Sequence, residues 1–501
     1  MWALARDPCY DRADLDGPPR RRPGRPSTLT GGFQVRLDHA VGKLGLFAGL
    51  TGVLTMASAA SVIAMNGGAS SSSGARVDPS RVAVATPLDV VASLRPFGKP
   101  PTTAQCKADD GIACYSPNQL ETAYGMNSLY TKGDTGKGYT IVIVDSYGSP
   151  TIAADLASFD KGFGLAAPPS LTIITPEGKP PAYKSSNAAM VGWATETSLD
   201  VEYSHAMAPG ADILLVETPV NETVGTVGFG DIVKAENYVI KNNLGDVISQ
   251  SFGAPEETFP SAKSIESLRS AYKAAAKAGV TVLAAAGDAG ASGIENASGT
   301  EYYTKRVVDW PASDPLVTAV GGTQLHLNAA GDRTAPDNVW NDTALVGGPA
   351  AGGGGVSSVF ARPSYQSSVS SVVGSWRGIP DVALSAAVNG AALVYMSMPG
   401  TGAGYYLIGG TSEACPLFAG IVAVADQVAG HKLGQINPTL YSLGSSGAGI
   451  TDITKGNNTV KFFQSGKNHT VKGYTAVTGY DLASGLGTVD GADLVPALAA
   501  G

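Results

Sequence analysis

The sequence is poor in histidine, cysteine and charged residues. Its 501 residues include five histidines and four cysteines, and charged residues make up 15% of the chain. The absence of a Cys-x-x-Cys pair or a His/Cys cluster argues against a zinc site. The chain also lacks a basic stripe and carries a formal net charge of −8, which argues against nucleic acid as a partner.

The scarcity of histidine raises a question about one serine. The stretch GGTSEACP, Gly409 to Pro416, presents Ser412 at the start of an apolar run. A serine hydroxyl is a weak nucleophile until a neighbouring group, most often histidine, accepts its proton. No histidine stands in a setting typical of a catalytic base, such as a helix beginning with His-Gly-Thr-His. The histidines are His39, His205, His326, His431 and His469.

The N-terminal region contains a targeting pattern. Residues 44–65 are uncharged and largely apolar, and Ala57 and Ala59 form an A-x-A cleavage pattern. We interpret residues 41–69 as a signal peptide or, since the length permits it, a membrane anchor. Residues 1–40 are expected to be a poorly structured extension that reflects an over-predicted translation start. The catalytic part is therefore expected to be secreted, or anchored with that part outside the cytoplasm.

The remaining chain divides into a linker and one long regular region. Residues 70–104 are rich in Gly, Ser and Pro and are predicted to be a linker or short pro-segment. Residues 105–501 are predicted to form a single domain. Cys106 and Cys114 are close enough in sequence to close a small disulfide loop, and Cys415 in an apolar run is expected to be a buried small side chain.

Buried strands alternate with helices along this region. This alternation predicts βαβ units and a mostly parallel sheet with helices on both faces. Ligands of such sheets bind at the carboxyl ends of the strands, where Asp145, Asp288 and Ser412 are expected. The predicted strands are 139–150, 211–219, 243–253 and 280–286, with a helix at 261–279 before the last of them.

An acidic pair lies on a further predicted helix, in WATETSLDVEYSHAMAPGA. Glu196 and Asp200 are four residues apart and so share one helix face, where like charges repel. No Lys or Arg occurs between Lys184 and Lys234 to neutralise them. Two interpretations remain open at this point: a solvated acidic face, or a site built from paired carboxylates.

Three motifs in order resemble the sedolisin family of serine-carboxyl peptidases, which are relatives of subtilisin by fold. They are an E-x-x-x-D helix with Glu196 and Asp200, a G-D-x-G turn with Asp288, and the turn GGTSEACP with Ser412. The family usually has SGTS where this chain has GGTS. The resemblance extends over almost all of residues 105–501. It implies a subtilisin-like, doubly wound α/β fold in a single large catalytic domain.

The resemblance also implies roles for these residues. Ser412 would attack the peptide carbonyl, Glu196 would accept the serine proton, and Asp200 would orient Glu196. Asp288 would donate a hydrogen bond to the oxyanion, which a carboxyl can do only when it is protonated. The expected activity is therefore endopeptidase cleavage of proteins or peptides at acidic pH, by a chain expected to be monomeric.

Purely structural roles for Asp288 and Ser412 also stay open, as do two other functions for the chain. Asp288 could be an ordinary turn residue and Ser412 a helix N-cap. A histidine-based, subtilisin-like peptidase would use Asp145, His205 and Ser412 near neutral pH. A third possibility is a non-catalytic protein-binding relative on the same fold.

Two C-terminal segments, TDIT and VTGYDLASGLG, resemble the calcium site of the family. The ligands that the resemblance implies for one structural Ca²⁺ are the side chains of Asp452 and Asp481 and the carbonyls of Ile453, Val477 and Gly479. Oxygen-only ligation by carboxylates and carbonyls is what Ca²⁺ requires. The family usually has glycine where Val477 stands. Without the resemblance, two ordinary Asp-containing turns would explain these segments.

Overall fold

The structure is a computed structural model of the 501-residue chain. The predicted extension (1–40) and the predicted signal peptide or anchor (41–69) lie outside the residues that it describes. The described residues belong to one unit, Gly74–Gly501. They are 86–87, 90–91, 96–220, 226–296, 299–444 and 446–501.

A sheet of eight strands forms the centre of the described residues, in the order β12-β11-β9-β7-β4-β6-β5, with β15 also paired to β11. Every pairing in it is parallel except that of β12. Continuous apolar runs suit parallel strands, which are covered on both faces. The strands are β4 (Thr140–Ser146), β5 (Leu171–Ile174), β6 (Asp212–Thr218), β7 (Val247–Gln250), β9 (Thr281–Ala285), β11 (Thr318–Gln324), β12 (Asn338–Val339) and β15 (Val382–Ser385).

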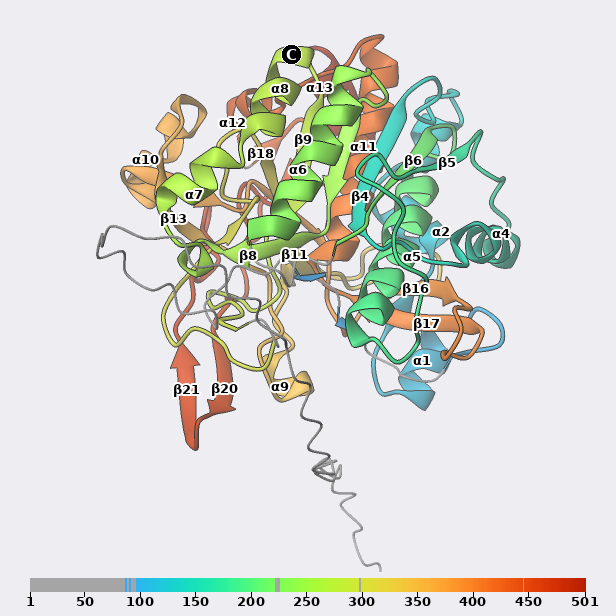
Figure 1. The fold of residues 1–501 in the computed structure, drawn as a ribbon, viewed down its shortest axis with the longest axis horizontal. Coiled ribbons are helices and arrows are strands. Elements are labelled where there is room, and N and C mark those ends of the chain that lie inside the picture. Colours follow the sequence, from blue (N-terminus) through green and yellow to red (C-terminus); the bar gives the residue numbers. More distant parts are fainter. Residues whose placement is uncertain (1–85, 88–89, 92–95, 221–225, 297–298, 445) are drawn as a thin grey trace, which may run out of the picture. The chain divides into compact units, whose positions relative to one another are not determined.

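Helices cover both faces of this sheet, as Figure 1 shows. Side chains alternate along a strand, so Ile141 and Ile143 of β4 enter one core cluster and Val142 and Val144 enter another. The first cluster contains α5 and α11, and the second contains α6 and α8. The predicted doubly wound α/β fold is confirmed.

The longer helices are α4 (Ile152–Phe163), α5 (Ala188–Met207), α6 (Thr226–Lys241), α8 (Ser270–Ala278), α11 (Thr411–Ala429) and α13 (Gly491–Ala499). The shorter helices are α1 (Thr103–Asp109), α2 (Pro117–Ala123), α3 (Asn127–Tyr130), α7 (Ala262–Ser267), α9 (Thr343–Val346), α10 (Ser370–Val373) and α12 (Asn437–Leu443). Two 3₁₀ turns, Glu256–Thr258 and Ser364–Val369, complete the helical elements of the described residues.

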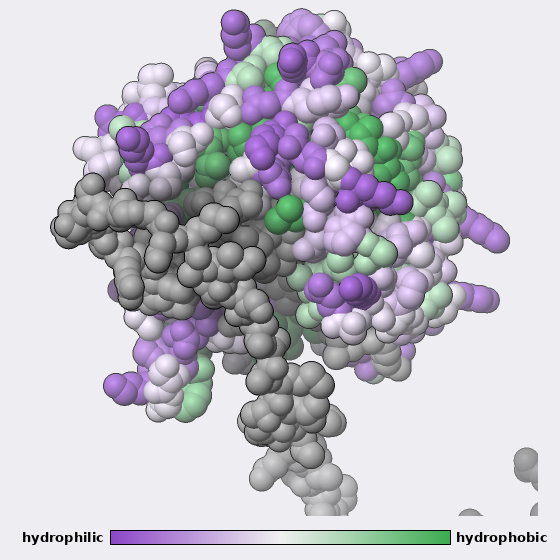
Figure 2. Space-filling model, in the orientation of Figure 1, coloured by the Kyte–Doolittle hydropathy of each residue, from purple (hydrophilic) through white to green (hydrophobic). Residues whose placement is uncertain are grey.

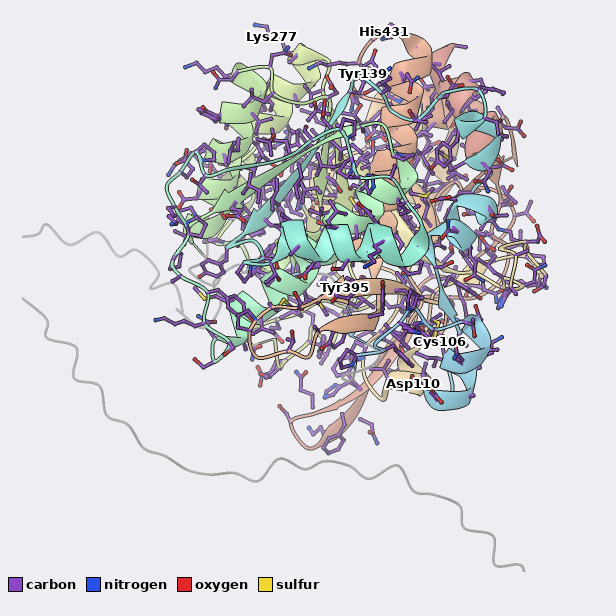
Figure 3. All side chains as sticks on the ribbon, turned by 90° about the vertical axis from the view of Figure 1, so that its right-hand side faces the viewer. Cys106, Asp110, Tyr139, Lys277, Tyr395 and His431 are labelled. Carbon is purple, nitrogen blue, oxygen red and sulfur yellow. A yellow bond between two sulfur atoms is a disulfide. The ribbon has the colours of Figure 1, made fainter. Side chains whose placement is uncertain are left out.

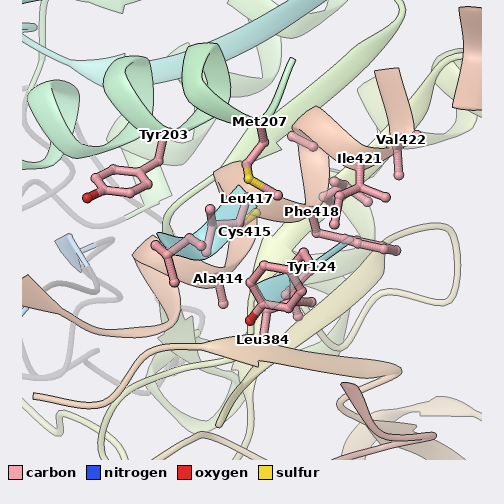
Figure 4. Packing of buried hydrophobic residues seen from close by; sticks show 14 of the residues in the cluster. Tyr124, Tyr203, Met207, Leu384, Ala414, Cys415, Leu417, Phe418, Ile421 and Val422 are labelled. Atoms are coloured by element: carbon pink, nitrogen blue, oxygen red, sulfur yellow. The ribbon is translucent and has the colours of Figure 1, made fainter. Parts of the chain in front are cut away.

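Helices α5 and α11 pack against each other in the core (Figure 4). A Cβ at Gly420 of α11 would lie 2.4 Å from the Cβ of Met207 on α5, so a glycine is what permits this approach. By length and composition α11 could cross a membrane, but 83% of its apolar window is buried inside the structure. It is therefore the core helix of this domain.

Smaller sheets surround the central one. Strands β1 and β2 lie in the predicted linker or pro-segment (70–104), yet β1 pairs with β8 and β2 pairs with β17. This segment therefore adds strands to sheets of the predicted peptidase domain. The remaining strands are β1 (Thr86–Pro87), β2 (Val90–Val91), β3 (Cys114–Tyr115), β8 (Phe252–Pro255), β10 (Asp309–Trp310), β13 (Gly355–Ala361), β14 (Trp376–Ile379), β16 (Ala391–Met396), β17 (Gly404–Gly409), β18 (Ser446–Gly447), β19 (Ile450–Thr451), β20 (Val460–Gln464), β21 (Lys467–Val471) and β22 (Thr488–Val489).

The helix predicted at 261–279 is two helices, α7 and α8, which meet at Arg269. Its Nε and Nη2 donate to the buried carboxylate of Asp314 at 2.6 and 3.0 Å, and its guanidinium lies over the ring of Phe360. A bidentate pair of this kind fixes both partners. These contacts hold the chain at the bend. The apolar periodicity of residues 261–279 could not predict them, because they involve residues outside that segment.

A disulfide joins Cys106 and Cys114, with the Cα atoms 5.9 Å apart. Cys106 belongs to α1 and Cys114 to β3, so the bond ties the first described helix to the small sheet of β2, β17, β16 and β3 (Figure 3). The disulfide that the spacing allowed is confirmed. Cys415 is a buried free cysteine, as expected.

Candidate active site

Ser412 lies where the chain passes from β17 into α11. Gly410 has φ of 122°, a conformation that side-chain-bearing residues rarely adopt. A Cβ at Gly409 would lie 2.8 Å from the carbonyl oxygen of Ala386. The two glycines of GGTS are therefore required by the turn. The N-cap of α11 is Gly410, so the interpretation of Ser412 as the helix N-cap is wrong.

Pro416 leaves the backbone carbonyl of Ser412 without its usual helical hydrogen bond. Proline has no backbone N–H, so the helical bond from residue 416 to the carbonyl of residue 412 cannot form. The hydroxyl of Ser251 lies 3.5 Å from that carbonyl oxygen instead. A second contact joins the same two residues: Ser412 Oγ donates a hydrogen bond to the backbone carbonyl of Ser251 at 3.3 Å. Ser251 follows β7 directly, at the carboxyl end of the central sheet.

The same serine hydroxyl connects the nucleophile region to the acidic helix. Ser251 Oγ donates to Asp200 Oδ1 at 2.7 Å. Asp200 and Glu196 are fully buried on α5, one helical turn apart on one face. The interpretation of this helix as a solvated acidic face is therefore wrong. The structure brings Asp200, Ser251 and Ser412 together, with Glu196 one turn earlier on the helix.

Asp288 approaches the same turn from the other side. It follows β9, and its Oδ1 accepts hydrogen bonds from the N–H and the hydroxyl of Thr411 at 2.8 and 2.7 Å. The N–H of Gly287 donates to the Thr411 hydroxyl at 3.1 Å. These partners lie more than a hundred residues away in sequence, so Asp288 is not merely a local turn residue. Its carboxyl is held next to the residue that precedes Ser412.

His205 lies elsewhere on α5. Its Nε2 is 2.8 Å from the carbonyl oxygen of Ala166 and 3.3 Å from Asp160 Oδ1. Asp145 at the end of β4 is buried, and burial raises the pKa of its carboxyl to about 7, with a hydrogen bond to Thr197 acting in the opposite direction. These contacts do not assemble a Ser-His-Asp triad at Ser412.

The other described histidines also bond away from Ser412. His326 contacts the side chain of Asn338, His431 contacts the carbonyl of Lys432, and His469 contacts the carbonyl of Gln464.

The titratable residues that follow Ser412 closely in sequence, Glu413 and Cys415, are uncharged in acid. Burial raises the pKa of the Glu413 carboxyl to about 8. Burial also raises the pKa of the Cys415 thiol to about 12, and the charge of Asp200 acts in the same direction. A thiol with so high a pKa is a poor nucleophile. Cys415 is therefore a poor candidate for a nucleophile at this turn.

The predicted calcium ligands lie on two segments that contact each other. The N–H of Gly479 donates to Asp452 Oδ2 at 2.8 Å, and the N–H of Val477 donates to Asp481 Oδ2 at 2.9 Å. Asp452 Oδ1 is buried and accepts no hydrogen bond from the described residues. A buried carboxylate oxygen of this kind is costly unless it is paired, and it is a ligand that Ca²⁺ prefers. The residues present therefore fit the ion.

Valine at position 477 does not disturb this fit. Val477 is not among the non-glycine residues with positive φ, and Ile453 beside Asp452 is buried. In the described part of the chain, no group of three or more His, Cys, Asp or Glu side chains could hold a metal ion. The predicted site depends instead on two carboxylates and backbone carbonyls. Among the described residues, the non-glycine residues with positive φ are Tyr147, Asn243, Ala448 and Ser465.

Two residues of the site were missed by the sequence analysis: Ser251 and Thr411. Thr411 stands inside GGTSEACP, next to the predicted nucleophile, and its position in the motif was the available signal. Ser251 ends a predicted strand, and strand ends are where ligands bind in such sheets. Both act through partners distant in sequence, so only the fold shows which groups they hold.

Comparisons with known proteins show the family to which the chain belongs. The subtilase family model matches residues 184–438. The chain is 33% identical over 417 residues to kumamolisin from Bacillus sp. (strain MN-32), covering 81% of this chain and 69% of that protein. It is 30% identical to sedolisin from Pseudomonas sp. (strain 101), covering 76% of this chain and 60% of that protein.

A solved structure is similar as well. Pseudomonas sedolisin, a serine-carboxyl proteinase complexed with two molecules of pseudo-iodotyrostatin, matches with a TM-score of 0.63 and 29% identity. The match covers 77% of this chain and 98% of the sedolisin chain. The order of the acidic helix, the Asp288 turn and the Ser412 turn is the order expected from the motifs. The chain belongs to the sedolisin family of serine-carboxyl peptidases, with the subtilisin-like fold.

Proposed function

We propose that this chain is an endopeptidase that hydrolyses peptide bonds of proteins in acid, through Ser412, Glu196, Asp200 and Asp288. The observation that carries the proposal is the convergence of Asp200 and Asp288 on the Ser412 turn, through Ser251 and Thr411. Ser412 Oγ attacks the peptide carbonyl while Glu196 accepts its proton. Glu196 then returns the proton to the leaving amine, and water releases the acyl group by the same steps.

The acidic optimum follows from the role of Asp288. Thr411 holds Oδ1 of this carboxyl beside the Ser412 turn, and a protonated Asp288 would donate from there to the oxyanion. Only a protonated carboxyl can donate in this way. Activity should therefore be greatest where Asp288 is protonated and Glu196 can still accept a proton.

The test is hydrolysis of a denatured protein by the full chain from acidic to mildly alkaline pH, with Ser412→Ala as the control. Serine-dependent cleavage confined to the acidic side supports the proposal. A serine-dependent optimum near neutral pH contradicts it and favours a histidine base. Folded protein that is inactive at every pH, after incubation in acid to permit maturation, favours a non-catalytic protein-binding role.

We propose that one Ca²⁺ stabilises the C-terminal segments, held by Asp452 and Asp481 and by the carbonyls of Ile453, Val477 and Gly479. When bound, the ion would neutralise the charge of the carboxylates that hold it. Addition of a chelator should lower the melting temperature, and excess Ca²⁺ should restore it. The same treatment of Asp452→Asn should have a smaller effect. An unchanged melting temperature in the wild type contradicts the proposal.

We propose an extracytoplasmic location for the catalytic domain. The disulfide between Cys106 and Cys114 supports it, because disulfides persist in oxidising compartments. Fractionation of expressing cells, with an N-terminal sequence of the product, tests both the location and the cleavage of residues 41–69. A product that stays in the cytoplasm with reduced cysteines contradicts this assignment.

A further inference from the structure

Strands β20 and β21 form a hairpin that projects from the domain (Figure 1). Their register places Lys461 opposite Thr470 and Phe463 opposite Asn468. Opposed residues of an antiparallel pair lie on one face of the sheet. Those four side chains are exposed, while Val460, Phe462 and Val471 on the other face are buried. The hairpin thus has an inner face fixed to the domain and an outer face without a partner in the described structure.

The outer face of the hairpin forms one wall of a groove, and α9 forms the other. The groove has a volume of about 850 Å³. Lys461, Phe463 and Lys472 line the hairpin side, and Phe463 is 70% exposed. The remaining polar lining is mainly amide and hydroxyl groups, from Asn341, Asn457, Asn468, Thr343, Thr459 and Thr470. Such a lining offers hydrogen bonds to an extended chain beside an exposed aromatic ring.

The charge of the hairpin region is opposite to that of the protein. Between Ile453 and Tyr480 the sequence contains four lysines and no Asp or Glu, although the whole chain has a net charge of −8. Figure 2 shows the projection as a mixture of hydrophilic and apolar residues. A local positive surface on a negative protein attracts anionic partners.

Backbone hydrogen bonds join the segment that contains Asp288 to the segments that line the groove. The carbonyl of Asp288 accepts from the N–H of Ala351, and the N–H of Ala291 donates to the carbonyl of Asn458 at the base of β20. Asn341 Nδ2 donates to the carbonyls of Asn457 and Thr459, both at 2.8 Å. These hydrogen bonds connect the Asp288 turn to the base of the hairpin.

We infer that this groove is a second substrate-binding site, which takes an acidic, extended segment of the polypeptide outside the cleaved region. The inference rests on the proposed peptidase function. Lys461 and Lys472 pair with carboxylates of the segment, Phe463 covers its apolar side chains, and the Asn and Thr side chains bond its backbone. The site favours acidic substrates through binding and leaves the chemical step unchanged.

The first test uses two peptides with the same cleavable core, one ending in six glutamates and one in six glutamines. In an assay at about pH 5, where exposed glutamates with an ordinary pKa near 4.3 are mostly charged, the wild type should have a KM about three- to tenfold lower for the glutamate peptide, because exposed charge pairs contribute modestly and additively. The double variant Lys461→Gln/Lys472→Gln should abolish this difference without a change in kcat. High salt should abolish it in the wild type too.

Lys273→Gln/Lys277→Gln is the matched control. Both are exposed lysines on α8, and Lys277 lies at the end of the domain opposite the hairpin (Figures 1 and 3). This variant also loses two positive charges and should keep the preference. A wild type that cleaves both peptides equally, or a preference that survives in the double variant, overturns the inference.

A binding measurement separates this inference from the proposed function. Fluorescence anisotropy of the labelled glutamate peptide with the Ser412→Ala protein requires no catalysis. Salt-sensitive binding that the two lysine substitutions remove supports the groove even if the wild type is inactive. Absence of such binding overturns it. Lysine-dependent binding to phosphatidylglycerol vesicles, without binding of the peptide, also overturns it and assigns the hairpin to a lipid surface.

Discussion

Helix α5 carries two sets of buried titratable side chains on different faces. Asp200 accepts from Ser251, whose carbonyl accepts from Ser412, and Glu196 lies one turn earlier on the same helix face. Glu202 and His205 lie toward α4 and β16, where Glu202 Oε2 accepts from the N–H of Tyr395 and His205 contacts Asp160. The residue types are similar and all four are fully buried. The neighbouring element decides which set can act on a nucleophile, so burial of a carboxylate is not by itself a sign of catalysis.

The two glutamates of this helix allow the strongest test of that comparison. Glu196→Gln removes the proposed base and should lower kcat/KM by about a thousandfold or more. Glu202→Gln keeps an acceptor for Tyr395 and should leave kcat/KM within about twofold, because burial raises the pKa of Glu202 well above its ordinary value and keeps it uncharged. Initial rates on one peptide measure both. Equal losses in the two variants would show that the comparison is wrong.

Asp288 should show the next largest effect. Asp288→Ala removes one oxyanion donor and should lower kcat by about a hundred- to a thousandfold while the protein still folds. Asp288→Asn retains an N–H donor that needs no acid, so it should keep more activity than the alanine variant and extend activity to higher pH. The measurement is kcat against pH, with circular dichroism as the folding control. Wild-type activity in the alanine variant would remove Asp288 from the mechanism.

Stability should fall as pH rises. Burial raises the pKa of Glu236, Asp309 and Glu413 to about 8, whereas unfolded carboxyls titrate near 4. The folded state therefore binds more protons than the unfolded state between these values. The stability that these three groups contribute is full below about pH 4 and is lost progressively up to about pH 8. Urea unfolding of Ser412→Ala, which avoids self-digestion, measures it. A rise in stability over this range would contradict the sign.

His205 should show the smallest effect on catalysis. His205→Gln should leave kcat/KM within about twofold and destabilise the fold by about 1–3 kcal/mol, since buried partners lose a hydrogen bond. Urea unfolding and initial rates measure the two effects separately. A hundredfold loss of activity in a variant that remains folded would restore histidine as the base.

Much of this fold could be predicted from local sequence patterns. The apolar runs predicted β4, β6, β7 and β9, because parallel strands covered on both faces need continuous apolar sequence. The projecting hairpin was not predicted, because its inner face is only a few residues long and its outer face is mixed. The bend between α7 and α8 was not predicted either, because it depends on the distant Asp314.

The candidate site divides in the same way. The motifs pointed to Ser412, Asp200 and Asp288 because each motif is a short, continuous stretch of sequence. The bonds that join them run through Ser251 and Thr411, across sequence separations of 161 and 123 residues. No local pattern carries that information, and it becomes visible only when the strands are placed side by side.

The groove beside the hairpin has a consequence for how the protein is produced. Asn341, Asn457 and Asn468 in its lining each begin an Asn-x-Thr acceptor sequence for N-glycosylation. Asn341 Nδ2 already donates two hydrogen bonds, whereas Asn468 is exposed on the outer face of β21. A glycosylating expression host would therefore attach sugar at Asn468 first, over the lysines of that face. Protein from such a host and protein from a bacterium would therefore differ at the surface of this groove, and measurements on the groove should state which was used.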